Sequence, residues 1–477
     1  MAIIAPPRPL AVRAPASAVA ELRALLRLAG PLVGANLVQM AVYAVDVIFV
    51  ARLSPVDFAA ATLGVFLYSL LLWALIGLTT ACAPIIAAEL GSRAHAVREV
   101  RRSFRMALWL AVIVALPCMA ILAQGETLLR LAGQDPLVAR RAGSFLDILL
   151  LSLIPSVAAG VMRTVAAALG RPGWALAVTL MALLLGILGN WALVFGHAGF
   201  PALGLEGSAL ASLATTLAMV LAFAMILMLD PRLRRYRLFG RWWRPEWPRL
   251  IEILRLGAPI AAGFTLEGAL FGGAAVLMGL ISVTAVAAHA VALNIAAIAF
   301  QIPLGIGQAA TIRVGMAYGA RDARWIARAG WTAIALGTGV MALTAGAIWF
   351  VPSLFVSAYL DLDAPANART VPLALRYLVI AAMFQLFDGA QVVLAGALRG
   401  LQDTRAPMVI AGFGYWGIGF VTACLLGFGL GWQGVGIWTG LAAGLMAVSI
   451  MLGWRWSHRT RLGLVPTEMV RSATQAP

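Results

Sequence analysis

Lysine is absent from this 477-residue chain, and charged residues of all kinds make up only 11% of it. Hydrophobic residues make up 62%, and the mean hydropathy is +0.94. A water-soluble globule of this size is excluded, because too few polar side chains are present to cover its surface. The composition therefore predicts an integral membrane protein.

Acidic residues are few beside the arginines, so the formal net charge is +16. A nucleic-acid-binding protein is not expected, because that function needs a basic patch on a soluble domain, and none is visible. The arginines instead cluster between apolar segments in an alternating pattern, as the positive-inside rule predicts for a membrane protein.

Cysteine is also scarce: Cys82, Cys118 and Cys424 lie in apolar stretches at unrelated spacings, which is typical of packing residues. The chain lacks a Gly-rich phosphate loop, a metal-ligand cluster and a nucleophile motif. These absences argue against an ATP-driven pump and against an enzyme, and no cofactor is expected.

Twelve apolar runs are long enough to cross a bilayer, and the chain is therefore predicted to be all-α with twelve transmembrane helices. The runs are 28–50, 59–83, 106–124, 144–162, 173–195, 204–229, 256–280, 286–312, 329–352, 377–398, 408–429 and 433–453. With both termini in the cytoplasm, 29 arginines lie inside and 6 outside, which favours this orientation.

The predicted domains follow from these runs. They are a cytoplasmic tail (1–25), a lobe of helices 1–6 (26–229), a basic cytoplasmic linker (230–251), a lobe of helices 7–12 (252–453) and a cytoplasmic tail (454–477). In the linker, Trp242, Trp243 and Trp247 stand among arginines, which predicts a short amphipathic segment at the membrane interface.

The two lobes are related by an internal repeat with an offset of 228 residues. It pairs Pro31 with Pro259, Ser54 with Ser282, Gly91 with Gly319 and Arg93 with Arg321. Two six-helix bundles in parallel register imply a pseudo-two-fold axis along the membrane normal. This arrangement is typical of secondary transporters, in which the substrate site lies between the bundles near the middle of the membrane.

Three acids are isolated in apolar runs: Glu267, Asp388 and Asp46. A carboxylate at that depth costs several kcal/mol unless it is protonated, paired or hydrated, so each one predicts a site for a cation or a proton. Their repeat partners are uncharged: Gln39 for Glu267, Ser152 for Asp388 and Ala274 for Asp46. A protonated carboxyl that only hydrogen-bonds a neighbouring helix stays open as an alternative.

Other residues near the acids are candidates for a substrate cleft. Phe384 and Gln391 share a helix face with Asp388, and Phe264 and Phe271 flank Glu267, so that each charge has aromatic area suited to organic cations. The further candidates are Gln385, Gln39, Asn190, His289, Asn294, Tyr415 and Trp416. For His289 a hydrogen-bonded structural role is preferred to a proton relay.

The chain resembles the multidrug and toxic compound extrusion (MATE) family, in its NorM-like branch, over about residues 25–455. The stretches that carry the resemblance are AVAAHAVALN, IPLGIGQAATIRVGMAYGAR, FQLFDGAQVVLAGALRGLQDTRAPM, YWGIG, GNWALVFG and PALGLEGSALAS. It implies two six-helix bundles around a V-shaped central cleft, and antiport of cationic drugs against Na⁺ or H⁺. By motif position, Glu267, Asp388 and Asp46 match acids of the family's seventh, tenth and first helices.

Three departures from the family pattern bear on whether the coupling ion is H⁺ or Na⁺. Phe384 stands where some sodium-coupled members have Tyr, Gly186 where an Asn is frequent, and Val421 where a Pro is common. Na⁺ prefers several hard oxygen ligands, so the loss of polar groups favours H⁺ over Na⁺ without deciding between them. Na⁺ bound at Glu267 and Asp388 remains the alternative.

The expected function is multidrug efflux across a bacterial inner membrane: a monomeric antiporter, surrounded by membrane lipid, exports amphipathic organic cations in exchange for H⁺ or Na⁺ by alternating access. A lipid-linked saccharide flippase of the same superfamily is the alternative, although its pyrophosphate would call for arginines in mid-membrane. An intramembrane enzyme lacks a nucleophile and base, and the repeat argues against a passive channel.

Overall fold

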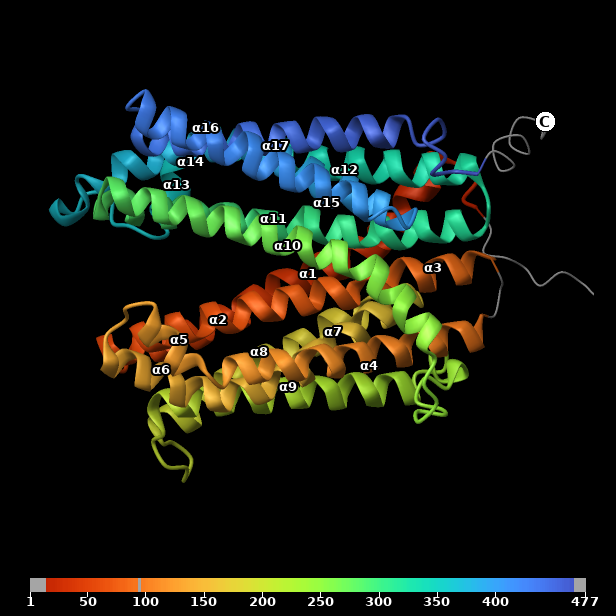
Figure 1. Ribbon diagram of the computed structural model, residues 1–477, viewed down its shortest axis with the longest axis horizontal. Coiled ribbons are helices and arrows are strands. Elements are labelled where there is room, and N and C mark those ends of the chain that lie inside the picture. Colours follow the sequence, from red (N-terminus) through yellow and green to blue (C-terminus); the bar gives the residue numbers. More distant parts are fainter. Residues whose placement is uncertain (1–13, 93–95, 467–477) are drawn as a thin grey trace, which may run out of the picture.

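The computed structural model describes residues 14–92 and 96–466, and within them the chain is helical with no strand (Figure 1). Residues 1–13 and 467–477 of the predicted tails lie outside the described residues, as does Arg93, the predicted repeat partner of Arg321.

The α-helices are α1 (Ala18–Val50), α2 (Pro55–Thr80), α3 (Cys82–Ser92), α4 (Val97–Leu122), α5 (Gly125–Leu131), α6 (Pro136–Leu149), α7 (Leu153–Ala168), α8 (Gly173–Phe195), α9 (Gly204–Leu229), α10 (Trp247–Ile281), α11 (Val283–Gly319), α12 (Ala323–Phe350), α13 (Pro352–Val356), α14 (Thr370–Gly400), α15 (Arg405–Gly412), α16 (Val421–Cys424) and α17 (Gln433–Ser457). The 3₁₀ turns are η1 (Leu150–Ser152), η2 (Arg234–Tyr236) and η3 (Pro365–Asn367), and the π-helical segments are η4 (Phe413–Phe420) and η5 (Leu425–Gly429).

Twelve helical segments of the described chain are long and apolar enough to cross a membrane, as predicted. The second combines α2 with α3, the fourth combines α6, η1 and α7, and the eleventh runs from α15 to η5. Most helices extend past the predicted apolar runs, because polar residues beyond the hydrocarbon still form helical backbone hydrogen bonds. The tails and linker are correspondingly shorter than predicted: α1 begins at Ala18, α10 begins at Trp247 and α17 ends at Ser457.

The internal repeat is visible in how corresponding helices begin. Ser54 accepts a hydrogen bond from the Asp57 N–H at 3.0 Å, and its repeat partner Ser282 accepts one from the Ala285 N–H at 3.0 Å. Both serines are N-caps with extended backbone, which satisfies one of the unpaired N–H groups of each helix start. The two lobes therefore start their second helices in the same way.

The helices form two bundles, α1–α9 and α10–α17, which diverge from one another toward the left in Figure 1. They approach each other closely at the end where α1 begins and α17 ends, here called the seam end. There a Cβ on Gly91 would lie 1.9 Å from the Met316 carbonyl oxygen, and one on Gly319 would lie 1.7 Å from that of Ala88. Since these glycines are repeat partners, the α3–α11 contact is reciprocal and needs glycine on both sides.

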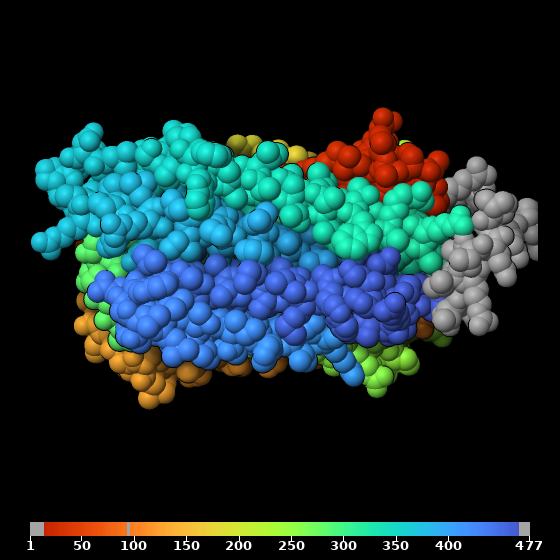
Figure 2. Space-filling model, turned by 90° about the horizontal axis from the view of Figure 1, so that it is seen from above, coloured from red at the N-terminus to blue at the C-terminus, as the bar shows by residue number. Residues whose placement is uncertain are grey.

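A buried ion pair also joins the bundles at the seam end. Glu21, in the first turn of α1, is fully buried and accepts hydrogen bonds from Arg313 of α11 at 2.8 and 2.7 Å. The indole N–H of Trp325, in α12, donates to the same carboxylate at 3.0 Å. Figure 2 shows the start of α1 (red) beside α12 (teal) at this end of the molecule. The sequence placed Glu21 in a tail, whereas it links the two lobes.

We expect Glu21→Gln to destabilise the protein, because it leaves the Arg313 guanidinium without its counter-charge. Breaking a buried pair costs about 3 kcal/mol, so the melting temperature in detergent should fall by about 5 °C. Glu126→Gln is the control, since its pair with Arg130 is exposed and should contribute under about 1 kcal/mol. Equal shifts for the two variants in a thermal unfolding measurement would contradict the role given to Glu21.

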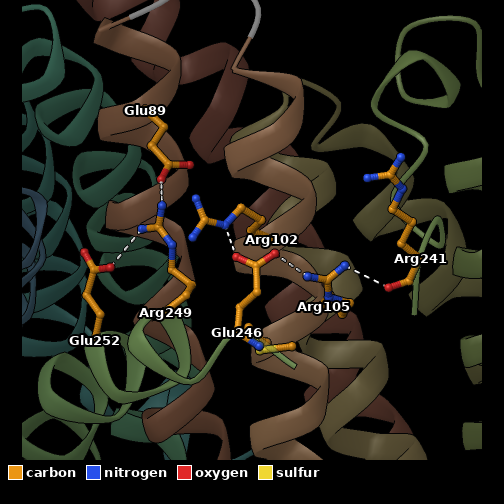
Figure 3. Close-up of polar contacts among 8 residues, drawn as sticks. Glu89, Arg102, Arg105, Arg241, Glu246, Arg249 and Glu252 are labelled. Atoms are coloured by element: carbon orange, nitrogen blue, oxygen red, sulfur yellow. Dashed lines mark hydrogen bonds and ion pairs between the residues drawn. The ribbon is translucent and has the colours of Figure 1, made fainter. Parts of the chain in front are cut away.

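A second group of ion pairs lies where the linker enters α10 (Figure 3). Glu246 pairs with Arg102 and with Arg105 of α4, the latter at 2.5 Å. Arg249, one turn later, pairs with Glu89 of α3 and with Glu252. Glu89, Arg249 and Glu252 border a cavity of about 530 Å³ that is lined by residues of both bundles. In this conformation the start of α10 is thus tied to the N-terminal bundle, by Glu246 to α4 and by Arg249 to α3.

Candidate functional site

Two of the three predicted acids come together in the C-terminal bundle. Asp388 of α14 and Glu267 of α10 both lie near the side-chain amide of Gln391, whose Nε2 is 3.2 Å from Asp388 Oδ1 and 3.5 Å from Glu267 Oε1. Asp388 and Gln391 are almost completely buried, whereas Glu267 is partly exposed. The contact to Glu267 is longer than an ordinary hydrogen bond, so this carboxylate is held only weakly.

Tyr415 orients the amide between the two acids. Its hydroxyl donates to Gln391 Oε1 at 2.8 Å, which leaves the amide N–H groups directed at the carboxylates. Tyr415 lies in η4, where the helix is π-helical and contains Gly414, Gly417 and Gly419. A π-helical segment shifts the following side chains around the axis, and such segments are frequent at functional sites. Tyr415 is itself buried at 2% exposure.

We expect Tyr415→Phe to lower transport about fivefold, because it removes one hydrogen bond, worth about 1 kcal/mol, from the group that orients Gln391. The measurement is the initial rate of cation efflux from proteoliposomes against substrate concentration. Tyr359→Phe is the control, since Tyr359 lies in the exposed segment after α13. An unchanged rate for Tyr415→Phe would show that the Gln391 amide keeps its position without the hydroxyl.

The aromatic residues predicted around the acids divide into two groups. Phe384 is only 1% exposed and packs edge-to-face on Phe271 and on Trp438, with ring centroids 5.9 and 5.6 Å apart. In this conformation Phe271 of α10 and Trp438 of α17 cover the Phe384 side chain, and its place in the substrate cleft stays a prediction. Phe271 and Phe264 remain partly exposed.

His289 belongs to this buried aromatic cluster. It is 2% exposed and its ring centroid lies 5.4 Å from that of Trp438. Neither of its ring nitrogens has a hydrogen-bond partner among the described residues, so the hydrogen-bonded structural role expected from the sequence is not found. Gln385 is likewise fully buried with no partner for its amide in the described chain, and its predicted place in the substrate cleft stays a prediction.

Aromatic residues and an arginine also lie near Glu267 along α10. The Arg399 guanidinium lies over the Phe264 ring, 5.2 Å from its centroid, and Phe264 is three residues before Glu267 in α10. Trp416 is partly exposed and donates its indole N–H to the Leu266 carbonyl at 3.3 Å. Aromatic and cationic groups therefore adjoin the acid from α10, α14 and η4.

The third acid, Asp46, occupies a separate site in the N-terminal bundle. Its Oδ1 accepts a hydrogen bond from Asn190 Nδ2 at 2.7 Å, and its Oδ2 accepts one from the Ser212 hydroxyl at 3.0 Å. Asn190 is fully buried and also donates to the Gly186 carbonyl at 2.9 Å. The predicted neighbourhood of Asp46 and Asn190 is found, and within the described residues no contact connects it to Glu267 or Asp388.

Two predicted cleft residues join neither site. Asn294 is exposed and donates to the Ala290 carbonyl of its own helix at 2.9 Å. Gln39 is partly exposed in α1, two turns before Asp46.

The repeat partner of the Asp388 site is uncharged. Ser152 is buried, and its hydroxyl lies 2.8 Å from that of Tyr68, which in turn lies 3.1 Å from the Ser156 hydroxyl. A neutral hydroxyl network therefore stands in the N-terminal bundle where the C-terminal bundle has a carboxylate. The pair formed by buried Asp388 and partly exposed Glu267 therefore belongs to one lobe.

Three contacts of these sites were not predicted from the sequence: Ser212 on Asp46, the Tyr415 hydroxyl on Gln391, and Arg399 over Phe264. Ser212 is a polar residue in an apolar run, a signal that could have marked it, whereas Tyr415 was a predicted cleft residue without a predicted partner. Arg399 was counted only as a charge at the end of a span. Among the described residues no group of three or more His, Cys, Asp or Glu side chains could hold a metal ion.

Comparison with known proteins places the chain in a family. The family model MatE matches residues 31–192 and 259–425, one stretch in each bundle. A protein of Mesorhizobium japonicum named "Probable multidrug resistance protein NorM" is 47% identical over 442 residues, which cover 93% of this chain and 95% of the relative. "Multidrug resistance protein NorM" of Burkholderia vietnamiensis is 38% identical, covering 91% of this chain and 93% of the relative.

Solved structures share the fold. The crystal structure of a eukaryotic MATE transporter superimposes with a TM-score of 0.84 at 20% identity, covering 94% of this chain and 99% of that one. A multidrug resistance MATE family transporter in an outward-facing conformation gives a TM-score of 0.80 at 21% identity, covering 93% and 96%. The fold is thus the twelve-helix arrangement of two pseudo-two-fold-related bundles around a V-shaped central cleft, and this chain belongs to the MATE family of membrane transporters, in its NorM-like branch.

Proposed function

We propose that this transporter exports amphipathic organic cations by antiport against H⁺ or Na⁺, with H⁺ the favoured ion. The NorM relatives are named as multidrug resistance proteins, which supports export of varied drugs. The observation that carries the proposal is the pair of carboxyl groups, Glu267 and Asp388, on either side of the Gln391 amide.

Two carboxylates that share one amide inside a membrane are strongly destabilised unless positive charge enters the site. A proton or an organic cation can each supply that charge. Because both compete for the same carboxylates, loading one favours release of the other, which is the requirement for antiport.

The directions of the hydrogen bonds favour H⁺ over Na⁺. The oxygen of Gln391 is already taken by the Tyr415 hydroxyl, so the amide presents N–H groups to the acids and offers no oxygen to a bare cation. Sodium would be left with carboxylate oxygens and few other ligands, whereas hard cations prefer a full oxygen shell. A proton needs only one carboxylate oxygen.

The groups around Glu267 suit an organic cation. Phe264, Phe271 and Trp416 are all partly exposed and present aromatic area near the charge, through which a delocalised cation gains cation–π contact and apolar burial. Such contacts have little directionality, which fits a broad substrate range.

The proposed cycle is alternating access between the two bundles. From the outward-facing state the carboxyl groups take up the coupling ion, the bundles rock, and a cytoplasmic cation displaces the ion at Glu267 and Asp388. The protein would work as a monomer in the bacterial inner membrane. We place the seam end and both termini in the cytoplasm, because this orientation assigns 29 of the 35 arginines of the sequence to cytoplasmic segments.

The flippase alternative is less well supported. A pyrophosphate substrate would need basic side chains in mid-membrane, whereas the charges there are acidic. Arg399, the cation over Phe264, lies in the last turn of α14.

The proposal is tested with purified protein in liposomes loaded with a fluorescent organic cation. A pH gradient or a Na⁺ gradient is imposed separately, and cation movement is followed. Movement driven by the pH gradient alone is the expected result. Movement driven only by Na⁺ would overturn the assignment of H⁺, and no movement under either gradient would overturn antiport of organic cations.

A further inference from the structure

The linker between the bundles is a fixed part of the N-terminal bundle. Leu233, Tyr236 and Leu238 are buried, and the Phe239 ring packs edge-to-face on Phe104 of α4 with centroids 5.5 Å apart. At the start of the linker, burial alone would raise the pKa of Asp230, but hydrogen bonds from the Trp174 indole and the Arg232 N–H hold that pKa below its usual value. The linker therefore presents a defined surface.

An apolar groove of about 230 Å³ runs between α4 and α7 beneath this linker. All of its lining residues are apolar: Leu108, Ala111 and Val112 from α4, Ile154, Ala158 and Met162 from α7, and Phe239 and Trp242 from the linker. The α7 residues are spaced one turn apart over eight residues, so the groove is about 12 Å long at 1.5 Å per residue. That is close to the depth of one leaflet, about half of a 30 Å hydrocarbon core.

The linker end of the groove is basic. Arg101, Arg105, Leu108 and Val112 follow one another at helical spacing on one face of α4, so the apolar surface continues directly into the arginines. A Cβ on Gly240 would lie 3.4 Å from Arg101 Nη1, which places this guanidinium against the turn between Phe239 and Arg241. Arg105 donates to the Arg241 carbonyl at 2.8 Å and so holds that turn.

Arg241 itself is available to a ligand. Its side chain is exposed, and among the residues that the structure describes its guanidinium forms no ion pair. Figure 3 shows its backbone carbonyl bonded to Arg105, while its guanidinium stands outside the Glu246 cluster. Trp242 and Trp243, 37% and 77% exposed, lie beside it, and tryptophan at such a level is typical of the membrane interface.

We propose that this groove is a binding site for an anionic phospholipid of the leaflet at the seam end, with one acyl chain between α4 and α7 and the phosphate at Arg101 and Arg241. An amphipathic anion is the occupant whose chemistry fits both the apolar groove and its basic linker end. An organic cation could enter the apolar groove, but Arg101 and Arg241 would repel its charge. A second copy of the chain would need a contact far larger than eight residues provide.

Occupancy of the site would stabilise the attachment of the linker to α4. Glu246, which pairs with Arg102 and Arg105, directly precedes α10, the helix that carries Glu267. The lipid would thereby act on the junction between the two bundles at a distance from the acidic pair.

The test is native mass spectrometry of the full-length protein with added phosphatidylglycerol or phosphatidylcholine. Wild type is expected to retain one phosphatidylglycerol in preference to phosphatidylcholine. Ala158→Trp, which fills the groove, should reduce retention at least about tenfold, and Arg241→Gln should reduce phosphatidylglycerol retention about fivefold while leaving phosphatidylcholine unchanged. The matched control is Arg369→Gln, an exposed arginine next to α14, outside the groove and the linker.

Equal retention of the two lipids by wild type would overturn the proposal, as would undiminished phosphatidylglycerol binding in both variants. Displacement of the lipid by tetraphenylphosphonium, an organic cation, would assign the groove to substrate instead. If Ala158→Trp does not fold, judged by size-exclusion chromatography and circular dichroism, Arg241→Gln decides alone, since that side chain is exposed and makes no ion pair in the described chain.

Discussion

Asp388→Asn is expected to reduce proton-driven cation efflux at least about 100-fold, which corresponds to about 3 kcal/mol in the rate-limiting step. Asparagine keeps the size of the side chain and can still bond the Gln391 amide, but it can neither take up a proton nor attract a cation. Asp388 is buried, so no other charge can approach from solvent to replace it. Substrate binding should weaken together with the rate, because in the proposed mechanism the same carboxylate binds the ion and the drug.

The measurement is the initial efflux rate in proteoliposomes under a fixed pH gradient, with the amount of folded protein verified for each variant. Asp363→Asn, in the exposed segment before α14, is the control and should transport at the parental rate. Glu267→Gln should show a comparable loss, because the two acids share one amide. Parental transport by both variants would eliminate the carboxylate mechanism.

The fold and the acids could be predicted because charge and hydropathy mark them directly. A single carboxylate in an apolar run stands out, and Gln391 follows Asp388 by three residues, so a helix places both side chains on one face. The repeat likewise predicted two acids in one lobe without charged partners in the other, and the neutral Ser152–Tyr68 hydroxyl contact stands at the position that corresponds to Asp388.

The rest of the site depends on contacts that periodicity does not encode. In a membrane protein the lipid-facing and core-facing sides of a helix are both apolar, so the sequence did not reveal that Phe384 and Gln385 face the core. The Tyr415 hydroxyl reaches Gln391 from a π-helical segment, whose local geometry no residue pattern had indicated. Glu21 and Arg313 are 292 residues apart in the chain, and Glu21 stood in a region that looked like a tail.

A cross-link at the seam end should reduce transport as strongly as the loss of Asp388, because it would block the rocking of the bundles. If the bundles rock, α3 and α10 must separate, and the ion pair between Glu89 and Arg249 must break (Figure 3). Cross-linking these two helices should therefore trap one state of the cycle. In a background with Cys82, Cys118 and Cys424 replaced by alanine, we expect Glu89→Cys combined with Arg249→Cys to lose nearly all efflux after treatment with a bifunctional thiol reagent.

If the cross-linker contains a disulfide, its cleavage by a reducing agent should restore the rate, because only the motion was blocked. The matched control is Phe49→Cys with Phe195→Cys, since these side chains meet within the N-terminal bundle at a ring distance of 5.8 Å and do not separate when bundles move as units. The efflux rate of each single-cysteine variant, treated with the same reagent, measures the effect of losing the ion pair without a cross-link. Because α3 and α10 belong to different bundles, full efflux by the cross-linked protein would mean that the substrate crosses without their separation, and alternating access by rocking would be wrong.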